Sequence, residues 1–162
     1  MILVDSSVWI DFLSSRPGPG GQELRRLIED AAPLAITGVV VTEVLQGLKR
    51  DVKRIEAYLS LFDLLEASGF ETYRNAATLF RLARSKGVSL TTTDALIATI
   101  AVENGAEAFS LDRDFVRMAH MGGFQLHQPE PSKRRVEVTA QMTSKAASNA
   151  GSAKVDVLWP SL

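Results

Sequence analysis

The stretch Thr91–Asn104 reads TTTDALIATIAVEN and carries the strongest pattern in the chain. Its apolar residues lie on most sides of a helix, as is typical of a buried helix; they are Ala95, Leu96, Ile97, Ala98, Ile100, Ala101 and Val102. We predict that Thr92 or Thr93 caps this helix and that Gly105 follows its last turn. Asp94 then lies in the first turn, where the helix dipole favours a carboxylate. A purely capping role for Asp94 also explains this pattern.

Short apolar runs alternate with helical patterns on both sides of this stretch. The runs predicted as strands are Met1–Val4, Leu34–Ile36, Leu64–Glu66, Ala106–Leu111 and Phe124–Leu126. The other predicted helices are Val8–Leu13, Gln22–Asp30, Val39–Lys49, Val52–Phe62 and Glu71–Lys86, and Arg16–Gly21 is predicted as a loop. This alternation predicts an α/β fold, a three-layer α/β/α sandwich with a mostly parallel central sheet.

Composition limits the classes of function. The chain has 162 residues, which favours one domain, and its formal net charge of −1 argues against a surface that binds polyanions in bulk. The absence of cysteine excludes disulfides and thiolate zinc sites. His120 and His127 are too few for a histidine metal site, and we interpret both as ordinary residues. The chain start lacks the basic residues of a signal peptide, so we expect a cytoplasmic protein with no membrane association.

The predicted strands and helices end near His127. We therefore expect a compact domain over residues 1–127. Residues 128–162 are rich in Pro, Ser, Lys, Ala and Thr and lack a periodic apolar face. We expect this tail to be flexible, bound to a partner, or left over from cloning.

Four acidic residues occupy related places in this pattern. Asp5 follows the first strand, Asp112 follows Ala106–Leu111, Asp94 begins the central helix, and Glu43 lies on an early turn of another helix. In open α/β sheets, sites form at the carboxyl ends of the strands. Clustered carboxylates repel one another unless a cation neutralises them, and oxygen ligands without Cys or His indicate Mg²⁺ or Mn²⁺. The corresponding chemistry is metal-assisted attack of water on a phosphodiester. Capping by Asp5 and a solvated edge position for Glu43 remain open as alternatives.

The four segments around these acids resemble the successive motifs of PIN-domain ribonucleases, above all the VapC-type toxins of bacterial VapBC toxin–antitoxin modules. The segments are ILVDSSVWI (2–10), TEV (42–44), TDALIA (93–98) and SLDRDF (110–115). The resemblance covers about residues 1–127 and implies a PIN-like fold, Mg²⁺- or Mn²⁺-dependent cleavage of RNA, often a tRNA or ribosomal RNA, and inhibition by a VapB-type antitoxin. It assigns the metal-site role to Asp5, Glu43, Asp94 and Asp112, and a supporting hydroxyl to Ser7 and Ser110. We also expect a homodimer.

Two finer assignments follow. Asp112 directly follows a strand, whereas Asp114 lies in a predicted helix start that buries Phe115 and Met118. We therefore assign Asp112 to the metal and give Asp114 a capping or outer role, with direct ligation by Asp114 as the alternative. For the antitoxin groove or the dimer contact, the candidates are Trp9, Ile10, Leu13 and residues 40–44, with core packing as the alternative.

Three other functions compete with a toxin. Aspartyl-phosphate phosphatases also place an Asp after the first strand, but they need a second acid two residues later, where this chain has Ser7. A non-catalytic PIN-like binding module usually lacks one or more of the acids. A housekeeping RNA-processing nuclease of the same fold is the main alternative, because the motifs do not distinguish it from a toxin.

Overall fold

A four-stranded, all-parallel sheet forms the centre of the fold. The computed structural model describes residues 1–121 and 123–129. The strands are β1 (Ile2–Val4), β2 (Leu34–Thr37), β3 (Asp63–Leu65) and β4 (Glu107–Phe109), in the order β3-β2-β1-β4. The first four predicted strands are therefore confirmed. The fifth, Phe124–Leu126, is wrong as a strand. Only Leu126 pairs there, in an isolated parallel bridge with Ala108.

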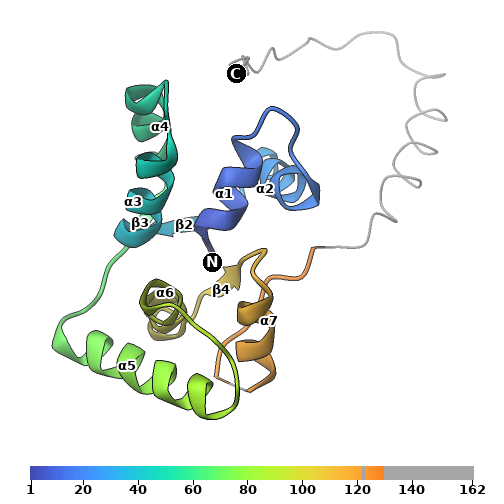
Figure 1. Cartoon of the computed structure of the whole chain (residues 1–162). Coiled ribbons are helices and arrows are strands. Elements are labelled where there is room, and N and C mark those ends of the chain that lie inside the picture. Colours follow the sequence, from blue (N-terminus) through green and yellow to red (C-terminus); the bar gives the residue numbers. More distant parts are fainter. Residues whose placement is uncertain (122, 130–162) are drawn as a thin grey trace, which may run out of the picture. The chain divides into compact units, whose positions relative to one another are not determined.

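Helices cover both faces of this sheet. They are α1 (Ser6–Phe12), α2 (Pro19–Glu29), α3 (Gly38–Gly47), α4 (Val52–Leu59), α5 (Phe70–Ser85), α6 (Thr92–Glu103) and α7 (Arg113–His120). Helix α1 packs against α2, and α5 packs against α6. In Figure 1 these two pairs lie on opposite sides of the strands, which confirms the three-layer arrangement. Every helix of the described residues is too short or too polar to cross a lipid bilayer.

Helix α6 is buried as its sequence predicts, but its cap lies one residue earlier. Thr91 is the N-cap, and its hydroxyl accepts a hydrogen bond from the Asp94 amide at 3.1 Å. The Asp94 carboxylate in turn accepts the Thr91 amide, so the two residues form a capping box. Ala98 and Ala101 are completely buried. Gly105 ends the helix at a φ of 59°, as expected for a residue after the last turn.

Helix α2 begins inside the segment that was predicted as a loop. Pro19 is its first residue, where a missing N–H costs nothing. The Asp11 carboxylate accepts the Gly18 and Gly21 amides at 2.8 and 2.7 Å, so it closes the turn between α1 and α2. A Cβ on Gly21 would lie 2.7 Å from the Phe12 backbone. Gly21 is therefore required for close packing of the two helices, whereas we had interpreted the Gly and Pro residues as signs of a loop.

The two edges of the sheet differ. At the outer edge of β4, the Ala108 carbonyl accepts the His127 amide at 2.9 Å, beside the Leu126 bridge. At the opposite edge, Asp63 and Leu64 of β3 are exposed, and no strand of the described residues pairs with the outer side of β3.

Residues 130–162 lie outside the described residues, so the domain boundary at residue 127 and the nature of the tail remain predictions.

Candidate active site

The strand order places a crevice between the carboxyl ends of β1 and β4. After β1 the chain continues to β2 and β3 on one side, and it returns to β4 on the other side of β1. Ligands of open α/β sheets bind at such a reversal. Val4 pairs with Phe109, and the Asp5 amide donates to the Phe109 carbonyl at 2.9 Å. The residues that follow the two strands are therefore neighbours.

Asp5 is a buried carboxylate held by two hydroxyl groups. Only 5% of the residue is exposed. Its Oδ2 accepts the Ser7 hydroxyl at 2.6 Å, the Ser110 hydroxyl at 2.9 Å and the Ser7 amide at 3.3 Å. Burial raises the pKa of the Asp5 carboxyl above its usual value, and the hydrogen bonds from Ser7 and Ser110 partly oppose that rise. The site thus holds a carboxylate that lacks full hydration.

The same two hydroxyls connect Asp5 to the loop that carries Asp112. The Ser7 oxygen accepts the Leu111 amide at 3.0 Å, and the Ser110 oxygen accepts the Asp112 amide at 3.1 Å. Each serine therefore donates to Asp5 and accepts from the loop after β4. This double use of each hydroxyl fixes the position of Asp112 relative to Asp5.

Asp112, and not Asp114, caps helix α7. The Asp112 Oδ1 atom accepts the Asp114 amide at 2.8 Å, and the Asp114 carboxylate pairs with Arg117 at 2.9 Å. The capping role that we gave to Asp114 is therefore wrong, because Asp112 occupies the extended position directly before the first helical residue. Phe115 and Met118 are completely buried, as predicted. An outer role for Asp114 in metal binding remains a prediction.

Asp94 approaches from the first turn of α6. Its Oδ2 accepts the Thr91 amide at 2.8 Å and the Thr91 hydroxyl at 2.6 Å, and the residue is half-buried. Helix α6 packs against β4 and leads into it through Gly105. Its first turn therefore lies towards the carboxyl edge of the sheet, the edge that also carries Asp5. The capping interpretation of Asp94 is confirmed, and it leaves the second carboxylate oxygen for another role.

Glu43 lies on α3, which directly follows β2. Val40 and Val44 on either side of it are buried, and Glu43 itself is half-buried. The Thr37 hydroxyl caps α3 by accepting the Val40 amide at 3.2 Å. Within the described residues, the Glu43 carboxylate forms no hydrogen bond or ion pair, and α3 packs against α6. Glu43 thus lies on a helix next to the one that carries Asp94.

Comparison with known proteins identifies the family. The sequence matches the PIN domain family over residues 2–121. This chain belongs to the PIN domain family. It is 30% identical over 129 residues to the VapC ribonuclease Mb1587 of Mycobacterium bovis and, equally, to ribonuclease VapC11 of Mycobacterium tuberculosis. Each alignment covers 77% of this chain and 96% of the relative, so the chain is a VapC-type PIN domain.

Solved structures share the fold of this PIN domain at lower sequence identity. A toxin–antitoxin complex from Klebsiella pneumoniae contains a chain that is 24% identical, with a TM-score of 0.62, over 80% of this chain and 98% of that one. VapC20 of Mycobacterium tuberculosis, described as a sarcin–ricin loop cleaving toxin, is 16% identical. Its TM-score is 0.60, and the match covers 79% of this chain and all of VapC20.

The donor chemistry of the PIN domain fits a hard divalent cation. Its four predicted acids supply only oxygen ligands, and among the described residues none of the four pairs with Lys, Arg or His. All three hydrogen bonds from Ser7 and Ser110 reach Oδ2 of Asp5. As the described side chains stand, however, no group of three or more His, Asp or Glu is close enough to hold an ion. Asp5 and Asp112 are joined by one network, and Glu43 and Asp94 lie outside it.

The sequence did not indicate the contact between His127 and Glu23. His127 Nε2 lies 3.0 Å from Glu23 Oε1, although we had interpreted His127 as an ordinary residue. Arg26, and then His127, lower the pKa of the Glu23 carboxyl. Trp9 is completely buried and packs edge-on against Phe62 at 4.9 Å, so its core alternative is confirmed. The spacing of residues along the sequence does not indicate the contact of His127, because its partner Glu23 lies 104 residues away.

Proposed function

We propose that this VapC-type PIN domain is an endoribonuclease that uses Mg²⁺ or Mn²⁺ to hydrolyse phosphodiester bonds of RNA. The observation that carries this proposal is the buried Asp5 carboxylate at the reversal of strand order, tied through Ser7 and Ser110 to Asp112. A carboxylate buried beside other acids is costly without a cation. The VapC ribonuclease relatives support the reaction class.

In this proposal Asp5, Glu43, Asp94 and Asp112 hold the ion. When bound, the ion supplies an activated water and stabilises negative charge on the phosphate oxygens. The chain's own contribution is orientation. Ser7 and Ser110 fix Oδ2 of Asp5, and Thr91 fixes one oxygen of Asp94, so each carboxylate keeps its other oxygen for the site.

We further propose that the protein acts as a toxin in the cytoplasm and that a VapB-type antitoxin inhibits it. The relatives are named VapC, and the structural neighbours include toxin–antitoxin complexes, which favours a toxin over a housekeeping nuclease. Ile10 on α1 is 55% exposed and is the best placed of the predicted contact residues, since Trp9 is buried. The homodimer remains a prediction, and a tRNA or ribosomal RNA is the expected substrate.

The test is RNA cleavage by Asp5→Asn and Asp94→Asn variants in the presence of Mg²⁺ or Mn²⁺. Each variant should lose at least about 100-fold in kcat, because a missing carboxylate weakens the charge stabilisation at the reacting phosphate. Glu56→Gln on the exposed face of α4 is the matched control and should cleave at the wild-type rate. Wild-type cleavage by Asp94→Asn would contradict the assignment of the site.

A further inference from the structure

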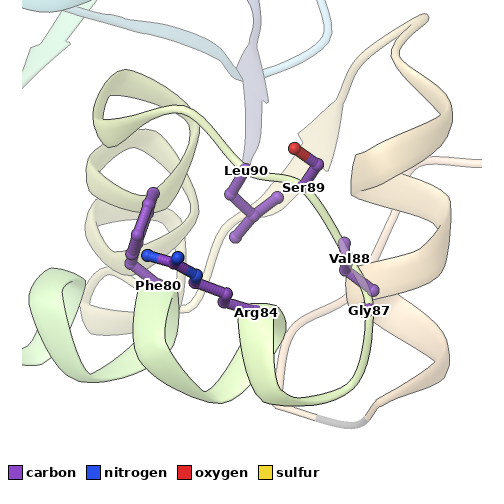
Figure 2. Close-up of a pocket in the computed structure, with 6 residues that line it drawn as sticks. All are labelled: Phe80, Arg84, Gly87, Val88, Ser89 and Leu90. Atoms are coloured by element: carbon purple, nitrogen blue, oxygen red, sulfur yellow. The ribbon is translucent and has the colours of Figure 1, made fainter.

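Helix α5 and the loop before α6 border an open hollow. It measures about 450 Å³, within the range of about 300–1,000 Å³ for small-molecule sites, and is lined by Phe80, Arg84, Gly87, Val88, Ser89 and Leu90. In Figure 2 Phe80 and Arg84 both extend from α5, the guanidinium end of Arg84 points towards Phe80, and Leu90 extends from the loop towards them. The hollow therefore combines an aromatic ring and a cation with an apolar floor, whereas the Ser89 hydroxyl points away from Phe80 and Arg84 in Figure 2.

The guanidinium group of Arg84 is available for a ligand. Arg74 on the same helix pairs with Glu71, and Arg117 pairs with Asp114. Arg84 is exposed, and its guanidinium forms no hydrogen bond or ion pair with any described residue. Because the chain has a net charge of −1, a polyanion must be bound by such local cations.

The hollow is close to the Asp94 carboxylate. Leu90 lines it, and the next residue, Thr91, donates its amide to Asp94 Oδ2 at 2.8 Å. A second, more apolar hollow of about 370 Å³ shares Phe80 and extends to Thr92 and Leu96 on α6. The Phe80 ring is therefore reached from both hollows, within a few residues of a predicted metal ligand.

We propose that this hollow binds one nucleotide of single-stranded RNA beside the scissile bond, with its base against Phe80 and its phosphate on Arg84. Aromatic rings stack on any base, and a guanidinium matches the geometry of a phosphate. The backbone at Gly87 supplies polar groups for the base edge. This inference rests on the proposed ribonuclease function and adds to it a subsite for one nucleotide, with the modest base preference that stacking strength gives.

The first test measures binding without cleavage. A fluorescent single-stranded RNA of about ten nucleotides is titrated with the full chain in EDTA, and Kd is read from anisotropy. Phe80→Leu and Arg84→Gln should each weaken binding about fivefold or more, from the lost stacking or phosphate contact. The controls are Phe70→Leu, at an exposed ring that begins α5, and Arg54→Gln, at an exposed cation on α4.

Arg84 is exposed, so its replacement should leave the fold intact, and thermal melts verify this for all four variants. Equal Kd values for Arg84→Gln and Arg54→Gln would overturn the subsite.

The second test sequences the ends of products from a random RNA pool with Mg²⁺ or Mn²⁺. Phe80→Leu should raise KM more than it lowers kcat and should weaken base preference at one position beside the cut. An unchanged preference would overturn the subsite while cleavage itself stands.

A wild-type protein that cleaves no RNA would instead refute the proposed function. The EDTA titration still decides the subsite in that case, because it needs neither metal nor cleavage. Loss of affinity in both pocket variants but in neither control would then support a nucleotide-binding site without hydrolysis.

Discussion

Asp5 combines burial with a negative charge, and this combination makes the site dependent on pH. Burial raises its pKa, so without metal the Asp5 carboxyl binds a proton more readily in the folded state than in the unfolded chain. The stability that comes from this group is present below the ordinary Asp pKa and is lost as the pH rises through the raised value. At neutral pH the metal-free protein therefore carries an electrostatic cost at Asp5, which a bound cation would remove.

Asp5→Asn should accordingly gain stability relative to the wild type as the pH rises. We expect the difference in free energy of unfolding, variant minus wild type, to increase between about pH 4 and 7 in EDTA. Urea titrations at several pH values measure it. Addition of Mg²⁺ should raise the stability of the wild type more than that of the variant. A difference that stays constant over this pH range would contradict the role of burial.

Asp112 and Asp114 offer a second test on single residues. Asp112 is joined to Asp5 through Ser110, whereas Asp114 is paired with Arg117. We therefore expect Asp112→Asn to lose about 10-fold or more in metal affinity and Asp114→Asn to lose less. Isothermal titration calorimetry with Mn²⁺ measures the metal affinity of both variants and of the wild type. A larger loss in Asp114→Asn would make Asp114 the direct ligand.

At the scale of elements, the contact between α1 and α2 depends on Gly21. A side chain there would collide with the Phe12 backbone, which cannot move aside as a flexible side chain can. Gly21→Ala should therefore destabilise the protein by about 1–3 kcal/mol, as overpacking usually does. Gly38→Ala is the matched control, since nothing lies within 4 Å of a Cβ at the start of α3. Urea unfolding measures both, and equal stability of the two variants would show that α1 and α2 can separate at little cost.

The elements were predictable wherever local pattern decides them. The apolar residues of α6 and the short apolar strands follow from spacing and side-chain chemistry. The start of α2 was not predictable from local pattern. The Asp11 carboxylate accepts hydrogen bonds from the amides of Gly18 and Gly21, which lie seven and ten residues later, and the helix therefore begins inside a Gly-Pro segment. The strand predicted at Phe124–Leu126 is only a single bridge at Leu126 for a similar reason, since pairing depends on the partner strand.

The sequence predicts residues for the candidate site, and their metal-binding role remains a prediction, whereas their arrangement was not predictable. Motif order gave the four acids and two serines, yet the hydroxyl bridge from Asp5 to Asp112 spans more than 100 residues. No local pattern encodes such a contact. The convergence of Glu43 and Asp94 on the same point remains a prediction from the resemblance, because among the described residues neither side chain joins the network of Asp5 and Asp112.

For the whole molecule, strand order decides both where the site lies and which edges of the sheet are open. The reversal between β1 and β4 brings residues from the two ends of the domain together at Asp5 and Ser110. Folding must therefore bring β4 beside β1 before the candidate site exists. A partly folded chain, with β1 to β3 paired and β4 absent, would hold Asp5 without its Ser110 partner.

The open edge of β3 has a consequence for the behaviour of the protein in concentrated solution. The unpaired N–H and C=O groups of an edge strand can form hydrogen bonds with the edge strand of another molecule, which leads to aggregation. A charged residue on the edge strand opposes this pairing. Asp63 stands at that position, next to the exposed Leu64. Asp63→Thr should therefore raise light scattering at high protein concentration, whereas Glu56→Thr on α4 should leave it unchanged. A single carboxylate far from the chemistry would then keep neighbouring molecules apart.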